Sequence, residues 1–230
     1  MRQKLLLLLF LVSLPIAIMA YDCEVNGIYY NLDTSNMTAE VTYKNLYSSG
    51  YSGDVSIPSK FTYSGNIYTV TSIMDKAFML QSPITSVTIP TTVTTIGSDA
   101  FDGCTGLTSI TIPSSVTTIG QGAFYGCTSL TSVDIPSSVT TIGLGAFGNC
   151  TSLTSITVSE ENTVYDSRND CNAIIETSSN TLISGCKNTK IPNTVTIIGS
   201  AAFNGCTGLT SITIPSSVTS IGSSAFDGCI

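Results

Sequence analysis

The sequence predicts a mainly β solenoid, in which short segments of one repeated unit stack on each other. A 23-residue unit recurs almost letter for letter, as the spacing of Ile89-Pro90, Ile112-Pro113 and Ile135-Pro136 shows. Phe and Cys recur at the same spacing, and each unit carries an alternating apolar segment that ends in Ile-Pro. A fixed period of about 20–29 residues, rich in Leu and Ile, is typical of a solenoid. Stacked units form long surfaces rather than deep pockets, so the repeat favours binding over catalysis.

Residues 1–20 predict a secretory signal peptide. Arg2 and Lys4 form a basic start, Leu5–Ile18 is an apolar run, and Ala20 is a small residue suited to cleavage. The run is too short and wrongly flanked for a membrane span, although an uncleaved anchor remains an alternative. We therefore expect a secreted or cell-surface protein with no membrane span after removal of the signal.

The composition excludes several classes of function. Eight Lys and Arg stand against fifteen Asp and Glu, and the formal net charge is −7. Loss of Arg2 and Lys4 with the signal would leave six against fifteen, or −9, which argues against nucleic acid or an anionic membrane as partner. The chain has no His, which removes Ser-His-Asp and Cys-His catalysis and the commonest zinc and iron ligand sets. We expect no catalytic residues, no metal site and no cofactor.

Residues 21–73 do not follow the repeat and predict an N-terminal β cap. Val25–Leu32 and Met37–Tyr43 alternate on either side of a turn, which is typical of a β-hairpin. Lys60–Tyr63 and Ile67–Val70 predict a second hairpin. A solenoid needs such a cap because its first coil would otherwise expose one side of the core.

Residues 74–230 predict the solenoid itself, with 107–129 as the model unit. Its first segment alternates as a strand does, and Pro113 ends it where a missing N–H does least harm. Gly120 allows a turn after a second short extended piece, and 123–127 predict a single helical turn. Parallel strands about 4.8 Å apart and a right-handed coil are expected. The side chains expected to point inward are Val116, Ile119, Ala123, Phe124, Cys127, Leu130, Val133 and Ile135.

The fourth unit is irregular between about 160 and 190. Ile191-Pro192 follows Val158-Ser159 after 33 residues instead of 23. Cys171–Glu176 and Thr181–Cys186 are extended runs on either side of a polar turn. The extra residues therefore predict an inserted hairpin at the edge of the solenoid.

The cysteines fall into two groups. If the inserted hairpin turns on 177–180, Cys171 lies opposite Cys186, and opposed strand residues are within reach of a disulfide. A disulfide and two free thiols both remain open for this pair. The others at one repeat position are expected to be free, buried thiols in a line unsuited to metal: Cys104, Cys127, Cys150, Cys206 and Cys229.

The outward positions of the main strands form the candidate binding face. Ranks of hydroxyls on a rigid sheet suit a polar docking surface, although Thr also simply favours strands and Ser is harmless there. Asp134 is the only charge among them. The residues are Ser86, Thr88, Ser109, Thr111, Ser132, Asp134, Ser155, Thr157, Ser211 and Thr213.

No paired carboxylates recur at a spacing suited to catalysis. Glu160-Glu161 and the 166–170 run, Asp-Ser-Arg-Asn-Asp, lie in the irregular segment. The run offers oxygen ligands for calcium but lacks the glycine and distal Glu of an EF-hand loop. We interpret these residues as solvated loop charges.

The unit L-T-S-I-T-I-P-S-S-V-T-T-I-G-x-x-A-F-x-G-C stands at 107–127, with close copies at 84–104, 130–150 and 209–229. It resembles the BspA-type leucine-rich repeat of bacterial surface proteins, common in Bacteroidales. The resemblance implies a curved, right-handed leucine-rich-repeat solenoid, export and surface attachment, adhesion to host matrix proteins or other microbes, and no active site. We therefore expect a non-enzymatic adhesin or recognition module for an extracellular protein or glycan. A structural spacer within a larger surface protein is the alternative.

Overall fold

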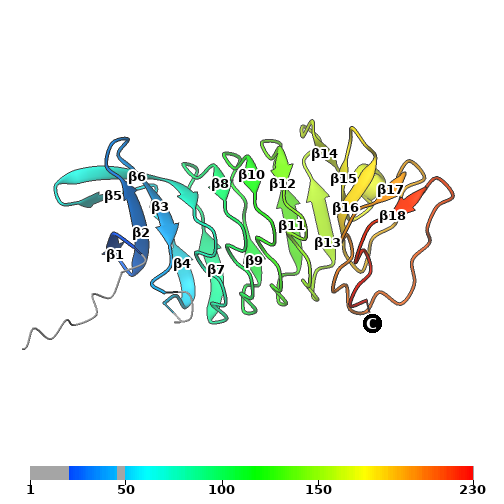
Figure 1. The fold of residues 1–230 in the computed structure, drawn as a ribbon, viewed down its shortest axis with the longest axis horizontal. Coiled ribbons are helices and arrows are strands. Elements are labelled where there is room, and N and C mark those ends of the chain that lie inside the picture. Colours follow the sequence, from blue (N-terminus) through cyan, green and yellow to red (C-terminus); the bar gives the residue numbers. More distant parts are fainter. Residues whose placement is uncertain (1–20, 46–49, 230) are drawn as a thin grey trace, which may run out of the picture.

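The computed structural model describes residues 21–45 and 50–229, so the predicted signal peptide at residues 1–20 lies outside it. The described chain forms an elongated stack of coils that runs from β1 to β18 (Figure 1). Its elements are short β-strands and one 3-10 helix. The prediction of a mainly β leucine-rich-repeat solenoid with parallel strands is confirmed, and its right-handed sense stays a prediction.

The N-terminal end consists of hairpins, as the sequence predicts. Strands β1 (Cys23–Val25), β2 (Ile28–Asp33) and β3 (Thr38–Thr42) pair antiparallel in that order. Strands β5 (Lys60–Tyr63) and β6 (Asn66–Ile73) form a second antiparallel hairpin, and β6 pairs parallel with β3. The cap therefore presents a parallel strand, β6, on which the first coil stacks.

Each coil contributes to two columns of parallel strands. The first column continues β6 with β8 (Thr95–Ile96), β10 (Thr118–Ile119) and β12 (Thr141–Ile142). The second column contains β4 (Gly53–Ser56), β7 (Ile84–Thr88), β9 (Ser109–Ile110), β11 (Ser132–Ile135) and β13 (Ser155–Val158). Within it, β4, β7 and β9 pair as one sheet and β11 and β13 as another. Equivalent residues of successive units face each other, so the sequence period sets the register.

The core is a stack of equivalent side chains. Phe78, Phe101, Phe124 and Phe147 follow one another with ring centroids 4.9, 5.2 and 5.4 Å apart, and their planes differ by at most 7°. Tyr51 extends the stack into the cap at 4.6 Å from Phe78. All eight side chains that the sequence predicts to point inward in the unit at 107–129 and its continuation are buried. Each large one stabilises the fold by about 1.5–3 kcal/mol on full burial.

The predicted helical turn at 123–127 is wrong. The segment forms consecutive turns, and Gly122 and Gly126 have φ of 59° and 67°. Asp99 and Gly103 repeat this pattern one coil earlier, with φ of 54° and 70°. Left-handed residues on both sides of the Ala-Phe pair interrupt a right-handed helix, so the backbone turns sharply instead.

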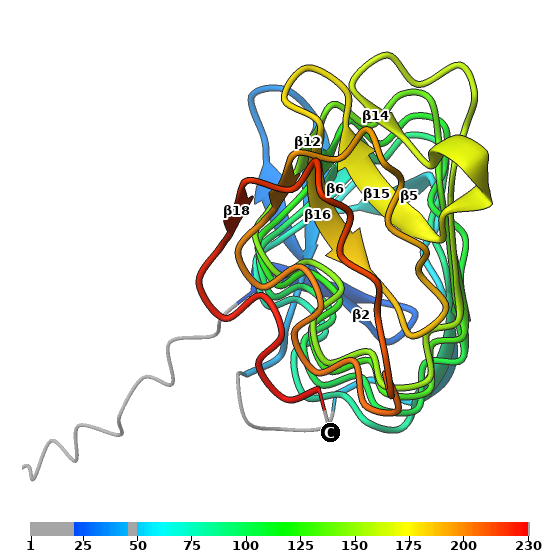
Figure 2. The same cartoon turned by 90° about the vertical axis from the view of Figure 1, so that its right-hand side faces the viewer.

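The irregular unit and the two coils that follow it contribute a separate five-stranded sheet and the 3-10 helix. These elements are β14 (Tyr165–Asp166), the 3-10 helix η1 (Arg168–Asp170), β15 (Ala173–Glu176), β16 (Thr181–Gly185), β17 (Ile197–Ile198) and β18 (Ser220–Ile221). β15 and β16 form an antiparallel hairpin, and β16 then pairs parallel with β17. Seen along the long axis, the yellow segment around β14 and η1 projects beyond the outline of the green coils (Figure 2).

The expected register of the inserted hairpin needs a correction. Glu176 faces Thr181 as the turn predicts, but the register shifts between Ile174 and Ile175. Cys186 consequently lies with its Sγ 3.5 Å from the carbonyl oxygen of Asn172 instead of opposite Cys171. Both cysteines are free thiols, because the extra residue of the bulge moves them out of alignment.

The repeated cysteines form the predicted ladder of free thiols. Cys104, Cys127 and Cys150 are buried, and their Sγ atoms lie 3.0–3.2 Å from the carbonyl oxygens of the Phe residues in the preceding coil. Desolvation raises the pKa of Cys104 and of Cys150 to about 12. The expectation of full burial is wrong for Cys206 and Cys229, which are half-buried in the last described coils.

Candidate functional site

The outward side of the second strand column, here called the strand face, carries the predicted binding residues. In β7, the buried Val87 lies between the half-buried Ser86 and the exposed Thr88, as alternation requires. β11 follows the same rule. Every predicted face residue is exposed or half-buried, so all of them are accessible from solvent.

Strand pairing aligns most of these residues in two ranks. Ser86 faces Ser109, and Ser132 faces Ser155, in the first rank. Asp134 faces Thr157 in the second rank. Thr88 and Thr111 occupy that rank in the earlier coils, with Thr111 just beyond the end of β9.

The last predicted pair is not part of these ranks. Ser211 and Thr213 are exposed but lie in a segment without assigned strand. The segment that follows the inserted hairpin comes between, and Asn188 Nδ2 donates to the carbonyl of Thr154 at 3.2 Å. The insertion therefore separates these two residues from the continuous part of the face.

The strand face begins one coil earlier than the sequence predicted. β4 places Asp54 opposite Ser86 and Ser56 opposite Thr88. The signal was present in Val55-Ser56-Ile57-Pro58, which ends as the repeat strands end. Its distance of 32 residues from the next Ile-Pro hid it within a segment that lacks the regular period.

The two carboxylates of the face are held by hydroxyls of the next coil. Thr85 Oγ1 and Ser86 Oγ donate to Asp54 Oδ1 at 2.8 and 2.7 Å. These bonds, led by that of Ser86, lower the pKa of Asp54 below its ordinary value. Thr157 likewise donates its hydroxyl to Asp134 Oδ1. Hydroxyl donors favour the ionised form, so the face presents oriented negative charge.

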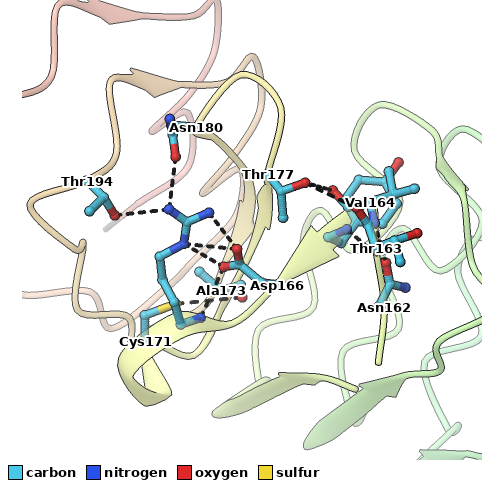
Figure 3. A network of polar contacts seen from close by, with 11 residues as sticks. Asn162, Thr163, Val164, Asp166, Cys171, Ala173, Thr177, Asn180 and Thr194 are labelled. Atoms are coloured by element: carbon cyan, nitrogen blue, oxygen red, sulfur yellow. Dashed lines mark hydrogen bonds and ion pairs between the residues drawn. The ribbon is translucent and has the colours of Figure 1, made fainter. Parts of the chain in front are cut away.

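The polar run in the insertion is a structural tie rather than a set of solvated charges. Arg168 Nε donates to Asp166 Oδ1 and Oδ2 at 2.8 and 2.9 Å. Its Nη1 donates to Asn180 Oδ1 at 2.9 Å and to Thr194 Oγ1 at 3.3 Å, and Figure 3 shows these partners converging. The guanidinium thus pairs with the Asp166 carboxylate and also contacts Thr194, so the run links the insertion to the next coil.

Two other kinds of site are absent from the described part of the chain. Residues 21–45 and 50–229 contain no group of three His, Cys, Asp or Glu side chains that could hold a metal ion. Within the same ranges, no helix has the length and apolar character that crossing a membrane requires.

Stacked 23-residue coils with a buried Phe column and two columns of parallel strands define a leucine-rich-repeat protein. The sequence profile described as "BspA type Leucine rich repeat region" matches six copies, over residues 71–180 and 174–230. The chain belongs to the BspA-type leucine-rich repeat family.

Solved structures agree with this assignment. A leucine-rich repeat protein from Bacteroides ovatus is 30% identical over 88% of this chain, with a TM-score of 0.58. A leucine-rich repeat protein from Eubacterium ventriosum is 26% identical over 89% of this chain, with a TM-score of 0.62. The chain spans 55% and 62% of the lengths of these two proteins. A search of curated proteins gives no significant match.

Proposed function

We propose that this chain is an exported, non-enzymatic binding protein, a cell-surface adhesin or recognition module whose strand face docks an extracellular protein. In this proposal residues 1–20 are the signal peptide, 21–73 the cap and 74–230 the solenoid. The observation that carries it is the alignment of outward hydroxyls and carboxylates on parallel strands, from Asp54 to Thr157. Such a surface is rigid because its backbone is fixed by the coils on either side.

The chemistry of the strand face favours a basic polypeptide as partner. Its polar groups are mostly Ser and Thr, and its charges at Asp54 and Asp134 are negative. The whole chain is also acidic, with a formal charge of −7. Complementary charge speeds encounter and excludes acidic partners. The ordered hydroxyls supply hydrogen bonds once the surfaces meet.

Direct binding tests the proposal. Purified 21–230 would be passed over immobilised fibronectin, fibrinogen and the basic polypeptide poly-lysine at low and high salt, with mucin as the acidic counterpart. The test variant changes Ser109, Thr111 and Ser132 together to Lys, which reverses the charge of the face. The matched control changes Thr117 and Thr140 to Lys, since both are exposed and lie just before β10 and β12 of the first strand column.

Saturable binding that the face variant loses and the control retains would support the strand face as the docking surface. Binding that weakens at high salt would support the electrostatic part of the proposal. Absence of binding to every protein, from a sample with an intact thermal transition, would favour the spacer role instead. Equal loss in both variants would contradict the assignment to this face.

A further inference from the structure

The turn edge, the surface formed by the Gly-x-x-Ala-Phe-x-x-Cys turns, differs in chemistry from coil to coil. The strand face repeats Ser and Thr with two Asp, whereas the variable turn positions hold Asp99 and Asp102 in one coil and Gln121 and Tyr125 in the next. The following coil carries Leu144 there. The repeat is nearly perfect elsewhere, but its residues vary at these turn positions. The stacking of the coils does not require this variation, so it gives the turn edge a local surface of its own.

The turn edge contains a shallow groove of about 270 Å³. Along the chain, the residues of this edge follow the first-column strand of each coil and precede the next strand of the strand face. The groove crosses several coils and is lined by Asp99, Asp102, Gln121, Tyr125, Leu144 and Asn204.

The inserted hairpin does not interrupt this groove, because the coil after the hairpin supplies one end of its lining. Asn149 N donates to the carbonyl of Asn204 at 2.8 Å, as Gly126 N does to Gly148 one coil earlier. The turn before the inserted hairpin therefore stacks directly on the turn after it. This contact brings the Asn204 coil beside the Leu144 coil.

Tyr125 supplies an accessible aromatic ring. Its side chain is 38% exposed, and the neighbouring Leu144 is 55% exposed. A Cβ on Gly148 would lie only 2.9 Å from Tyr125 Cδ2, so the ring rests against the Gly148 backbone. The absence of a side chain at Gly148 thus sets where the ring lies.

Two carboxylates lean toward the coil that carries this ring. Asp99 Oδ1 would lie 2.5 Å from a Cβ on Gly122, and Asp102 Oδ1 would lie 3.7 Å from a Cβ on Gly126. These glycines stand on either side of Tyr125 in the sequence. Both carboxylates therefore lie on the side of the ring that faces the preceding coil.

The polar groups of the groove are free to bind a ligand, unlike those of the strand face. In the described ranges, the side chains of Asp99, Asp102, Gln121 and Asn204 make no hydrogen bond to protein, whereas Asp54 accepts two. Partial burial and the charge of Asp99 raise the pKa of Asp102, and the positive charge of Lys76 acts in the opposite direction. Donors from a ligand would meet carboxylate acceptors that the protein has left open.

We propose that the groove at Asp99, Tyr125 and Asn204 binds neutral pyranose units of a glycan, on a surface separate from the strand face. A pyranose ring has one apolar C–H face, which matches the aromatic ring, and hydroxyls around its rim, which match carboxylates and amides. Charge-assisted bonds to the carboxylates fix orientation. The same carboxylates disfavour acidic sugars through like-charge repulsion.

Ligand-observed saturation-transfer NMR on 21–230 tests this inference. The probes are the methyl pyranosides of glucose, galactose, mannose and N-acetylglucosamine, each at roughly 10 mM because single-sugar sites commonly bind with Kd of about 1 mM. N-acetylneuraminic acid is the acidic counterpart. The variants are Tyr125→Ala, Tyr125→Phe and Gly148→Ala, with Ser109→Lys plus Thr111→Lys as the control on the strand face.

We expect transfer to the C–H protons of one face of at least one neutral pyranoside and none to the acidic sugar. Tyr125→Ala should weaken binding about tenfold or more, while Tyr125→Phe keeps the ring and should change it by less than about threefold. Gly148→Ala should weaken binding by displacing the ring, and the strand-face control should not.

Two results would overturn the inference: no transfer to any neutral pyranoside from folded protein, or transfer that survives Tyr125→Ala unchanged. Because the control leaves the turn edge intact, this outcome is independent of whether the strand face binds a protein.

Discussion

Ser86 donates its hydroxyl to Asp54 Oδ1 at 2.7 Å, although 32 residues separate them in the sequence. The bond joins a strand of the N-terminal segment to the first regular coil, so the strand face and the cap share one surface. β4 and β7 pair along this contact. The face that we propose for docking therefore starts before the regular repeat does.

The Asp54 contact predicts a pH dependence. Hydrogen bonds from Ser86 and Thr85 lower the pKa of Asp54 in the folded state, whereas the unfolded chain has the ordinary value of about 3.9. The stabilisation is therefore complete above the unfolded value and is lost as the pH falls through the folded value. A carboxyl-carbon NMR titration should give an Asp54 pKa below that of a model peptide.

Ser86→Ala should move the Asp54 pKa upward, toward the ordinary value, because the largest cause of its depression is removed. Ser109→Ala, one coil further, serves as the control and should leave it unchanged. A wild-type pKa at or above the model-peptide value would contradict the hydroxyl contacts.

The regular part of the fold could be predicted because the period determines it. Each apolar position recurs every 23 residues, so stacking puts Phe101, Phe124 and Phe147 in one column without further information. The strand-face residues follow from the same alternation. Their exposure is a consequence of which side of the strand the core occupies.

The parts that could not be predicted depend on departures from the period. β4 lies outside the spacing, and only the match of its Ile57-Pro58 ending indicates its place. The hairpin register depends on a bulge between Ile174 and Ile175, which a count of residues from the turn cannot show. The groove at Tyr125 depends on turn geometry and on coils that an insertion separates in the sequence.

Close packing between coils explains why Gly120 follows Ile119 in the repeat: any side chain there would clash with the preceding coil. A Cβ at Gly120 would lie 2.4 Å from the backbone nitrogen of Ser98 in the previous coil. Backbone cannot move aside as a flexible side chain can, so Gly120→Ala should destabilise the protein by about 3 kcal/mol or more. A thermal melt followed by circular dichroism would measure the change.

Gly145→Ala is the matched control for Gly120→Ala. No atom lies within 4 Å of its Cβ position, but its φ is +64°. The cost should therefore be conformational only, about 1–2 kcal/mol. A smaller loss of melting temperature for Gly120→Ala than for Gly145→Ala would contradict close packing of the coils.

The cysteine ladder predicts graded thiol reactivity. Thiolate is the reactive form, and burial raises the pKa of Cys104 and of Cys150 to about 12. Half-buried Cys229 should therefore react with Ellman's reagent first at pH 8, and Cys229→Ser should remove that fast phase. In guanidinium without reductant all eight cysteines should titrate. Rapid native reaction of every thiol, or two missing thiols after denaturation, would contradict the structure.

Arg168 predicts a local rather than a global effect of substitution. Its guanidinium joins Asp166, Asn180 and Thr194, and thereby connects η1, the β15–β16 turn and the next coil. The pair with Asp166 is about a quarter exposed on each side, so Arg168→Ala should cost only about 1 kcal/mol of global stability. The same change should raise amide hydrogen exchange around the β15–β16 turn, because the turn loses its anchor.

Arg168→Lys tests whether the positive charge or the planar shape of the guanidinium holds these contacts. Lysine keeps the positive charge near Asp166 but lacks the planar fork that reaches Asn180 and Thr194 together. Exchange in the turn should therefore rise nearly as much as in Arg168→Ala, while exchange in the Phe101–Phe124 coils stays at the wild-type rate. Wild-type exchange in the turn of both variants would show that the hairpin is held by its pairing with β17 alone.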